Sequence, residues 1–429
     1  MDYGSNIKVH SIDASNFQAD RTVTFRLQPN TVYRSNLRII NAGWLDSANT
    51  NAKINEHAGA WGNVKSIRLV DKGVELSKTV DVHPYVSFNL VQGSNSGAVN
   101  VVDPKVRTMA GLTLKASNGL STGGASLPAN ARNLIGTGEQ IGTKNTNANV
   151  TNAIPVNGVL DLSRCLPILS VLQYIPTNLF DDLRVVIEFR AGTTASLYAG
   201  KDVRQNVTNV GLPNIMSLQA EEVLGREGQM AMDNLSSFSW NEIESDELVI
   251  RNAVQNVEQS HTKRIKAFDN KSLNRILMFT VPQDDAQIFN GNAVLAYGRN
   301  NSITQNSSKI NFVVNGRTLF TGEGLTTNAS RMACCQDAWG DYICHVGSNE
   351  ISMDDQAGWL EDGANRIGQE DYVGANVGQK IQDLQLQYKR TDPGAVGAGR
   401  NHIMVLKIYG EVGKSLVLNA GGSYNIVYN

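Results

Sequence analysis

Apolar and polar residues alternate along most of this chain with the two-residue period of half-buried β-strands. In the first clear example, Val23, Phe25 and Leu27 share one face. Thr24 and Arg26 lie on the other face. The same pattern predicts strands at 31–41, 67–76, 158–162, 166–176, 183–190, 214–224, 235–250, 272–281, 309–320, 381–388, 402–409 and 416–427, with one short helix at 82–91.

Parts of this pattern occur twice. Residues 67–76 and 310–319 are both alternations interrupted by a two-residue turn that contains glycine, so each predicts a β-hairpin. Two further segments recur in the same order and at similar separations: 36–40 as 274–278, and 183–189 as 402–408. A duplicated all-β unit explains these recurrences better than chance similarity between strands.

The length of the chain fits two such units. At about 150 residues per domain, 429 residues correspond to two or three domains. We predict an N-terminal arm at 1–20, a first domain at 21–225 and a second at 226–429. Long polar or glycine-rich stretches at 93–157 and 326–375 interrupt the strands, which favours jelly rolls over up-and-down barrels. The predicted fold is therefore all-β: two tandem eight-stranded jelly rolls with long loop insertions.

Composition and charge narrow the function. Hydrophobic residues make up 41% of the chain and charged residues only 18%, against about 25% in average globular proteins. Such a surface suits either subunits that cover one another or a loop-rich β protein. The net charge of −2 provides no general attraction for nucleic acid. The sequence starts without a secretory signal pattern and has no apolar run of about 20 residues, so we expect synthesis in the cytoplasm.

Cysteine and histidine give one candidate metal site. Cys334 and Cys335 lie near Cys344 and His345, but adjacent ligands without a paired CxxC spacing are a poor start for tetrahedral zinc. Buried thiols in a packed insertion are the favoured interpretation. The six histidines show no spacing that indicates a nucleophilic cysteine with its base.

The other candidates are weaker. The acidic pairs 284–285, 354–355 and 361–362 lack calcium-loop spacing and fit solvated loops better. The glycine-rich run 135–142 lacks the strand, helix and lysine of a phosphate loop. The basic cluster of Lys263, Arg264 and Lys266 suits an acidic partner or, more simply, an exposed strand edge. We therefore assign no catalytic, cofactor-binding or metal-binding residue and expect no enzymatic activity.

Several strand segments resemble those of a known family. The opening strands at 22–38, the segment 159–167 with the strand 183–189, and the segment 378–388 are similar to parts of double jelly-roll major capsid proteins. Within that family, the likeness is to capsid proteins of polinton-like viruses and virophages, which are icosahedral DNA viruses. It covers the chain from about residue 22 onward.

The resemblance implies a structural role in a virion. Three chains would form a homotrimeric capsomer with a six-sided outline that tiles an icosahedral shell. Its partners would be neighbouring capsomers, penton proteins and minor capsid proteins, without sequence-specific nucleic acid binding. The loops 93–157 and 326–375 would face outward or lie between subunits. The arm at 1–20 would lie inside, in contact with neighbours or an inner membrane.

Two other classes of function remain open at this point. One is a carbohydrate-binding or adhesive tandem β-sandwich, which would expose Trp or Tyr side chains and normally requires export. The other is an enzyme on a double β scaffold, such as a two-barrel metal-dependent oxygenase. That enzyme would need a set of histidine and carboxylate ligands.

Overall fold

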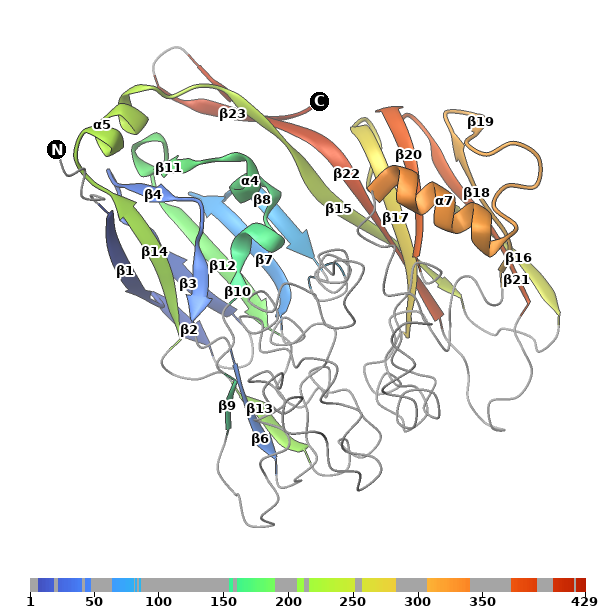
Figure 1. Ribbon diagram of the computed structural model, residues 1–429, viewed down its shortest axis with the longest axis horizontal. Helices are drawn as coiled ribbons and strands as arrows, with labels where there is room; N and C mark the ends of the chain where they lie inside the picture. Colours follow the sequence, from blue (N-terminus) through green and yellow to red (C-terminus); the bar gives the residue numbers. More distant parts are fainter. Residues whose placement is uncertain are drawn as a thin grey trace, which may run out of the picture.

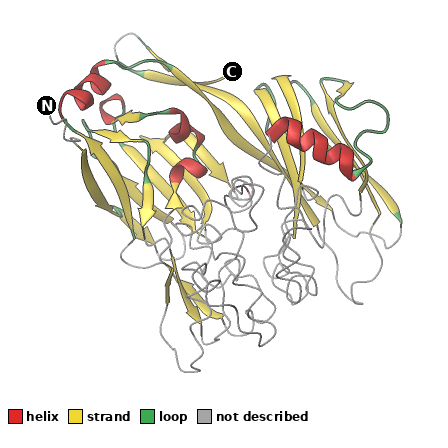
Figure 2. Cartoon of the chain, in the orientation of Figure 1, coloured by secondary structure: helices red, strands yellow, loops and turns green. Residues whose placement is uncertain are grey.

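A computed structural model describes most of the predicted strands. The described residues are 7–18, 22–40, 43–47, 64–80, 82, 85, 154–156, 160–189, 207–211, 216–250, 257–282, 307–339, 372–391, 404–419 and 422–429. They form two β-bodies side by side, joined by long strands (Figures 1 and 2). No helix within these ranges is long and apolar enough to cross a membrane.

The first body consists of two facing antiparallel sheets. One has the order β10-β5-β14-β4-β11, with β1 also paired to β14. Its strands are β1 (Ile7–Asp13), β4 (Val32–Arg34), β5 (Arg38–Ile40), β10 (Leu160–Asp161), β11 (Tyr174–Pro176) and β14 (Ser217–Val223). The other, ordered β2-β3-β12-β7-β8, contains β2 (Asn16–Gln18), β3 (Thr22–Arg26), β7 (Val64–Asp71), β8 (Val74–Val80) and β12 (Leu183–Phe189).

Smaller elements surround these sheets. A three-stranded sheet and four short helices complete the described part of the first body. They are β6 (Gly43–Ser47), β9 (Ile154–Val156), β13 (Val207–Gly211), η4 (Leu162–Arg164), α4 (Pro167–Val171), η5 (Thr177–Leu179) and α5 (Gly225–Asp233). Of the helix predicted at 82–91, only Val82 and Tyr85 are described, and both are helical and buried.

The second body repeats this arrangement. One sheet has the order β15-β22-β17-β20, extended by β23 on β22, and the other has the order β16-β21-β18-β19. The strands are β15 (Phe238–Ile250), β16 (Glu258–Arg264), β17 (Ser272–Pro282), β18 (Ser307–Val314), β19 (Arg317–Thr318), β20 (Tyr372–Lys380), β21 (Leu384–Thr391), β22 (Met404–Leu418) and β23 (Tyr424–Tyr428). Helix α7 (Asn328–Trp339) contacts β20 and β17.

The two bodies have the same topology. The strands correspond one to one in chain order. The first four positions, β1, β3, β4 with β5, and β7, correspond to β15, β16, β17 and β18. The last four, β8, β10 with β11, β12, and β14, correspond to β19, β20, β21 and β22. In each set, the first, eighth, third and sixth strands form one sheet in that order, and the second, seventh, fourth and fifth strands form the other. This is the eight-stranded jelly roll, so the predicted tandem of two jelly rolls is confirmed.

One of the three recurrences was matched to the wrong strand. The prediction paired residues 183–189 with 402–408, which would equate β12 with β22. However, β12 pairs with β7 of the first hairpin, and the strand that pairs with the second hairpin is β21. The strand β22 corresponds instead to β14. Sequence alternation cannot separate these strands, because all of them are half-buried in the same way.

The repeated hairpin is confirmed in both bodies. In the first, the turn between β7 and β8 has Lys72 at φ 45° and Gly73 at φ 88°. In the second, the turn between β18 and β19 has Asn315 at φ 50° and Gly316 at φ 80°. Two successive positive φ angles define the type I′ turn, which matches the twist of the flanking strands. Asn315 also accepts hydrogen bonds from the backbone N–H groups of Gln382 and Asp383.

Other predictions differ from the structure. Within the strand predicted at 166–176, residues 167–171 form the helix α4 and only Tyr174–Pro176 is a strand, β11. Pro167 starts the helix at a position suited to proline. The strands predicted at 402–409 and 416–427 are one continuous strand, β22, followed by β23. Strands β16 and β20 were not predicted. The loop 93–157, apart from β9, and residues 340–371 of the second insertion lie outside the described residues.

The N-terminal arm also needs correction over seven residues. We expected residues 1–20 to precede the first jelly roll, but Ile7–Asp13 forms β1 and pairs along its whole length with β14. By topology β1 corresponds to β15, the first strand of the second roll. The first jelly roll therefore starts near residue 7.

The repeated turn generates a stability prediction. A Cβ at position 316 would meet no atom within 4 Å, so replacing Gly316 by alanine tests only the backbone conformation. We expect Gly316→Ala to lower the free energy of unfolding by about 1 kcal/mol, measured by urea denaturation. The exposed neighbour Arg317 serves as the control, and Arg317→Ala should change stability by less than about 0.5 kcal/mol. Equal effects of the two variants would contradict the turn assignment.

Candidate functional site: the junction between the jelly rolls

Two long strands run through both jelly rolls. Strands β15 and β22 pair without interruption from Phe238 opposite Leu416 to Ile250 opposite Met404. At one end, Trp240 and Leu416 belong to the core of the first roll. At the other end, Ile250, Leu406 and Ile408 belong to the core of the second roll. The junction is therefore a continuous hydrogen-bonded ladder and not a flexible linker (Figure 1).

Strand β23 strengthens the ladder on the side of the first roll. It pairs with β22 over residues 414–418, just beyond the point where the pairing of β17 with β22 ends. The residue that follows β23, Asn429, is hydrogen-bonded to the second roll. Its N–H donates to the Gly413 carbonyl of β22, and its carbonyl accepts from the Ser272 N–H of β17. β23 thus connects the edge of the second roll to the surface of the first.

Tyr424 anchors β23 on the first roll. Its hydroxyl donates to Asp71 Oδ2 at 2.7 Å, and its ring packs edge-on against Phe180 at 5.5 Å between centroids. Asp71 is 4% exposed and also accepts a hydrogen bond from Asp182 N–H at 2.7 Å. Burial, followed by the hydrogen bond to Asp71, raises the pKa of Tyr424 well above its ordinary value. The hydroxyl therefore remains a hydrogen-bond donor at physiological pH.

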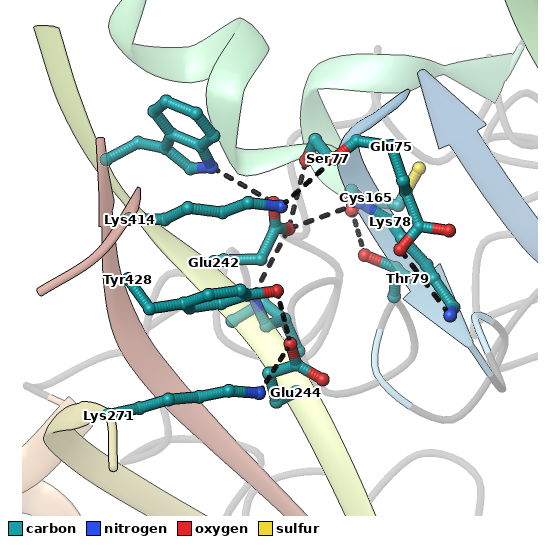
Figure 3. A network of polar contacts seen from close by, with 12 residues as sticks. Glu75, Ser77, Lys78, Thr79, Cys165, Glu242, Glu244, Lys271, Lys414 and Tyr428 are labelled. Atoms are coloured by element: carbon teal, nitrogen blue, oxygen red, sulfur yellow. Dashed lines mark hydrogen bonds and ion pairs between the residues drawn. The ribbon is translucent and has the colours of Figure 1, made fainter. Parts of the chain in front are cut away.

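Glu242 is the central buried group of the junction. It lies on β15, is 2% exposed and faces β8 of the first roll (Figure 3). Its Oε1 accepts from Ser77 Oγ at 2.9 Å, and its Oε2 accepts from Trp240 Nε1 at 3.0 Å. Lys414 Nζ lies 3.5 Å from Oε2, with its side chain 3% exposed. Burial raises the pKa of Glu242, while Lys414 and the hydrogen-bond donors oppose that rise.

A second pair of charges lies next to this one. Lys271 Nζ and the Tyr428 hydroxyl both contact Glu244 Oε1, at 3.0 and 2.9 Å. The ammonium groups of Lys271 and Lys414 lie 4.4 and 5.2 Å from the centre of the Tyr428 ring, within cation–π range. Burial also raises the pKa of Tyr428. Side chains from β15, β22 and β23, together with Lys271 just before β17, thus form one connected polar network.

On the first roll, the network continues through β8. Thr79 donates a hydrogen bond from its hydroxyl to the Cys165 carbonyl, and both residues are buried. Burial raises the pKa of the Cys165 thiol well above its ordinary value, which keeps it protonated and a poor nucleophile. This arrangement of groups suits a structural joint, because its buried donors, acceptors and charges satisfy one another across the two rolls.

The predicted candidate residues lie elsewhere. Cys334 and Cys335 are on α7, and Cys335 is buried, whereas Cys344 and His345 lie outside the described residues. In the part of the chain that the structure describes, no three potential metal ligands form a group. The acidic pairs at 284–285, 354–355 and 361–362 and the glycine-rich run 135–142 also lie outside it.

The basic cluster lies at a strand edge. Lys263 Nζ contacts Asp246 at 2.6 Å, and Arg264 pairs with Asp269 and Asp383. These cations, on the edge strand β16, are therefore neutralised by neighbouring carboxylates. This geometry matches the simpler interpretation of the cluster as an exposed strand edge.

Glu242 and Lys414 were missed in the sequence. A usable signal exists for each: Glu242 shares a strand face with Trp240, and Lys414 shares a face with Leu416. An ionisable residue at an inward position of two strands predicts a buried pair. The sequence does not reveal that the two strands are neighbours.

Solved structures of other proteins share this architecture. No protein-family model and no curated protein matches the sequence. The solved structure of the Sputnik virophage matches with a TM-score of 0.58 and 10% identity, over 99% of this chain and 89% of that chain. The mavirus major capsid protein matches with a TM-score of 0.56 and 9% identity, over 99% and 90%. The chain has the double jelly-roll fold. At these identities, the double jelly roll is what the structures share.

The buried ion pair between Glu242 and Lys414 of the double jelly roll generates a prediction. Glu242→Gln leaves Lys414 buried without a counter-charge, so we expect a loss of about 3 kcal/mol in the free energy of unfolding. Lys414→Met should cost a similar amount. The double variant should be more stable than either single variant, because neither charge then remains unpaired.

The control for this double-mutant cycle is on the same strand. Glu247 lies on β15, is 50% exposed and pairs with Lys407 at 2.7 Å. Glu247→Gln should cost clearly less than Glu242→Gln, because the Glu247 carboxylate is half-exposed and solvent screens its pairing with Lys407. Additive effects of the two junction substitutions in urea denaturation would contradict a coupled pair.

The anchor at Tyr424 generates another prediction. We expect Tyr424→Phe to destabilise the protein by about 1–2 kcal/mol, because Asp71 loses a buried hydrogen-bond donor. Tyr174 is a matched control, since its hydroxyl also bonds a carboxylate, Glu227, but in an exposed position. Tyr174→Phe should change the midpoint of urea unfolding much less. A reversed order of the two effects would rule out an anchoring role for Tyr424.

Proposed function

We propose that this chain is a major capsid protein, a structural subunit of an icosahedral virus shell. The observation that carries the proposal is the double jelly-roll architecture shared over 99% of this chain with the mavirus major capsid protein. The junction supports it further. A shell subunit must hold its two rolls in a fixed relation, and β15, β22 and β23 provide such a connection.

The proposed assembly unit is a homotrimer. Two rolls of equal topology in one chain become six similar rolls when three chains surround a threefold axis. The interface between chains would be heterologous, with the first roll of one chain against the second roll of the next. We propose residues up to 225 for the first roll and 226–429 for the second. The division falls at α5, between β14 and β15.

The proposed partners follow from this role. They are neighbouring capsomers, penton proteins and minor capsid proteins, in a virion whose subunits are made in the host cytoplasm. We infer a structural and not an enzymatic role. The support for this is the junction, where Glu242, Lys414 and Glu244 are engaged with other side chains of the same chain.

The trimer can be tested on the purified protein. We expect light scattering to give a mass near three times the 46.5 kDa chain, and negative-stain images to show six-sided particles. At high concentration these particles should form hexagonal arrays. A protein that remains monomeric at all concentrations and binds glycans would overturn the proposal in favour of an adhesive β-sandwich protein.

A further inference from the structure

An apolar groove lies at the end of the first jelly roll that carries α5. Its volume is about 750 Å³, and it lies between α5, β11 and the start of β15. The walls include Tyr174, Phe180, Leu224, Met230 and Phe238. Leu224 is 40% exposed and Met230 is 52% exposed. Large apolar side chains gathered around an open groove are typical of a binding surface.

The position of α5 beside this groove is well defined. A Cβ on Gly228 would come within 2.3 Å of the Val223 carbonyl oxygen. Glycine at this position therefore allows α5 to pack closely on the end of β14. Tyr174 of β11 donates a hydrogen bond to Glu227 of α5, which fixes the helix across the groove. The groove is thus preformed in the isolated chain.

The N-terminal segment starts at the wall of this groove. The first residue of β1, Ile7, is paired with Val223, the last residue of β14. The residue that follows, Leu224, lines the groove. Residues 1–6 precede β1 and lie outside the described residues. Six extended residues reach about 20 Å, so this segment is long enough to enter the groove from its point of attachment.

The composition of the segment matches the groove. Its sequence is Met-Asp-Tyr-Gly-Ser-Asn, with an aromatic residue at position 3 and an acid at position 2. The apolar walls suit the ring of Tyr3. Arg226, on the groove wall, is exposed, and within the described residues no ion pair is recorded for it. It is therefore available to the carboxylate of Asp2.

We propose that residues 1–6 dock in this groove of their own chain, with the Tyr3 ring between Met230 and Phe238 and Asp2 beside Arg226. The bound segment would extend β1 across the end of β14 and cover the exposed apolar side chains. It would then be unavailable for the contacts with neighbours or an inner membrane that the family resemblance implies for the arm at 1–20. This inference does not rest on the proposed function, because it concerns the single chain.

Photocrosslinking tests the docking in the full chain. With p-benzoylphenylalanine at position 3, irradiation should give adducts on Met230 and other groove residues within the same chain, mapped by mass spectrometry. The same photoreactive residue at position 74, which is exposed on β8, serves as the control and should give no groove adducts. A mixture of isotopically light and heavy chains separates crosslinks within one chain from those between chains.

A groove variant completes the test. Met230→Glu places a charge against the apolar side of the segment, so the yield of groove adducts should fall at least about tenfold. Because Met230 is half-exposed, this variant should fold normally, which circular dichroism can check. Val74→Glu should leave the yield unchanged. Adducts that map outside the groove, join different chains or persist in Met230→Glu would overturn the proposal.

Discussion

The continuous pairing of β15 with β22 is the constraint on which the rest of the structure depends. Each strand is long enough to pass from one jelly roll to the next, and each contributes side chains to both hydrophobic cores. The two rolls therefore share structural elements. A change in the angle between them would break backbone hydrogen bonds and expose apolar side chains at the same time. This coupling makes one chain a rigid block.

The polar network gives the ladder its register. A strand that slips by one residue turns every side chain to the opposite face. At the junction, a slip of β22 would turn Lys414 away from Glu242 and leave the Glu242 carboxylate buried without its counter-charge, which is strongly unfavourable. A buried ion pair adds little stability over an apolar pair of the same size. We therefore assign Glu242 and Lys414 mainly to the specificity of the junction.

Local features of the fold could be read from the sequence, and long-range pairing could not. The turns at Lys72-Gly73 and Asn315-Gly316 were predictable because they need only neighbouring residues. β16 was missed because it has no apolar alternation to detect. The sequence pattern divides β22 into two strands on either side of Gly410 and Gly413. In the structure, Gly410 lies inside the continuous strand, at a position where a Cβ would come within 2.6 Å of the Phe268 ring. The partners of β12 and of Glu242 depend on residues far away in the chain.

The most direct test of this account is the cooperativity of unfolding in the single chain. Differential scanning calorimetry of the unassembled protein should give one transition, with a calorimetric enthalpy equal to the van't Hoff enthalpy. That result follows if β15 and β22 make both cores parts of one cooperative unit. Two separate transitions, with one roll unfolding while the other stays folded, would contradict a shared structural junction.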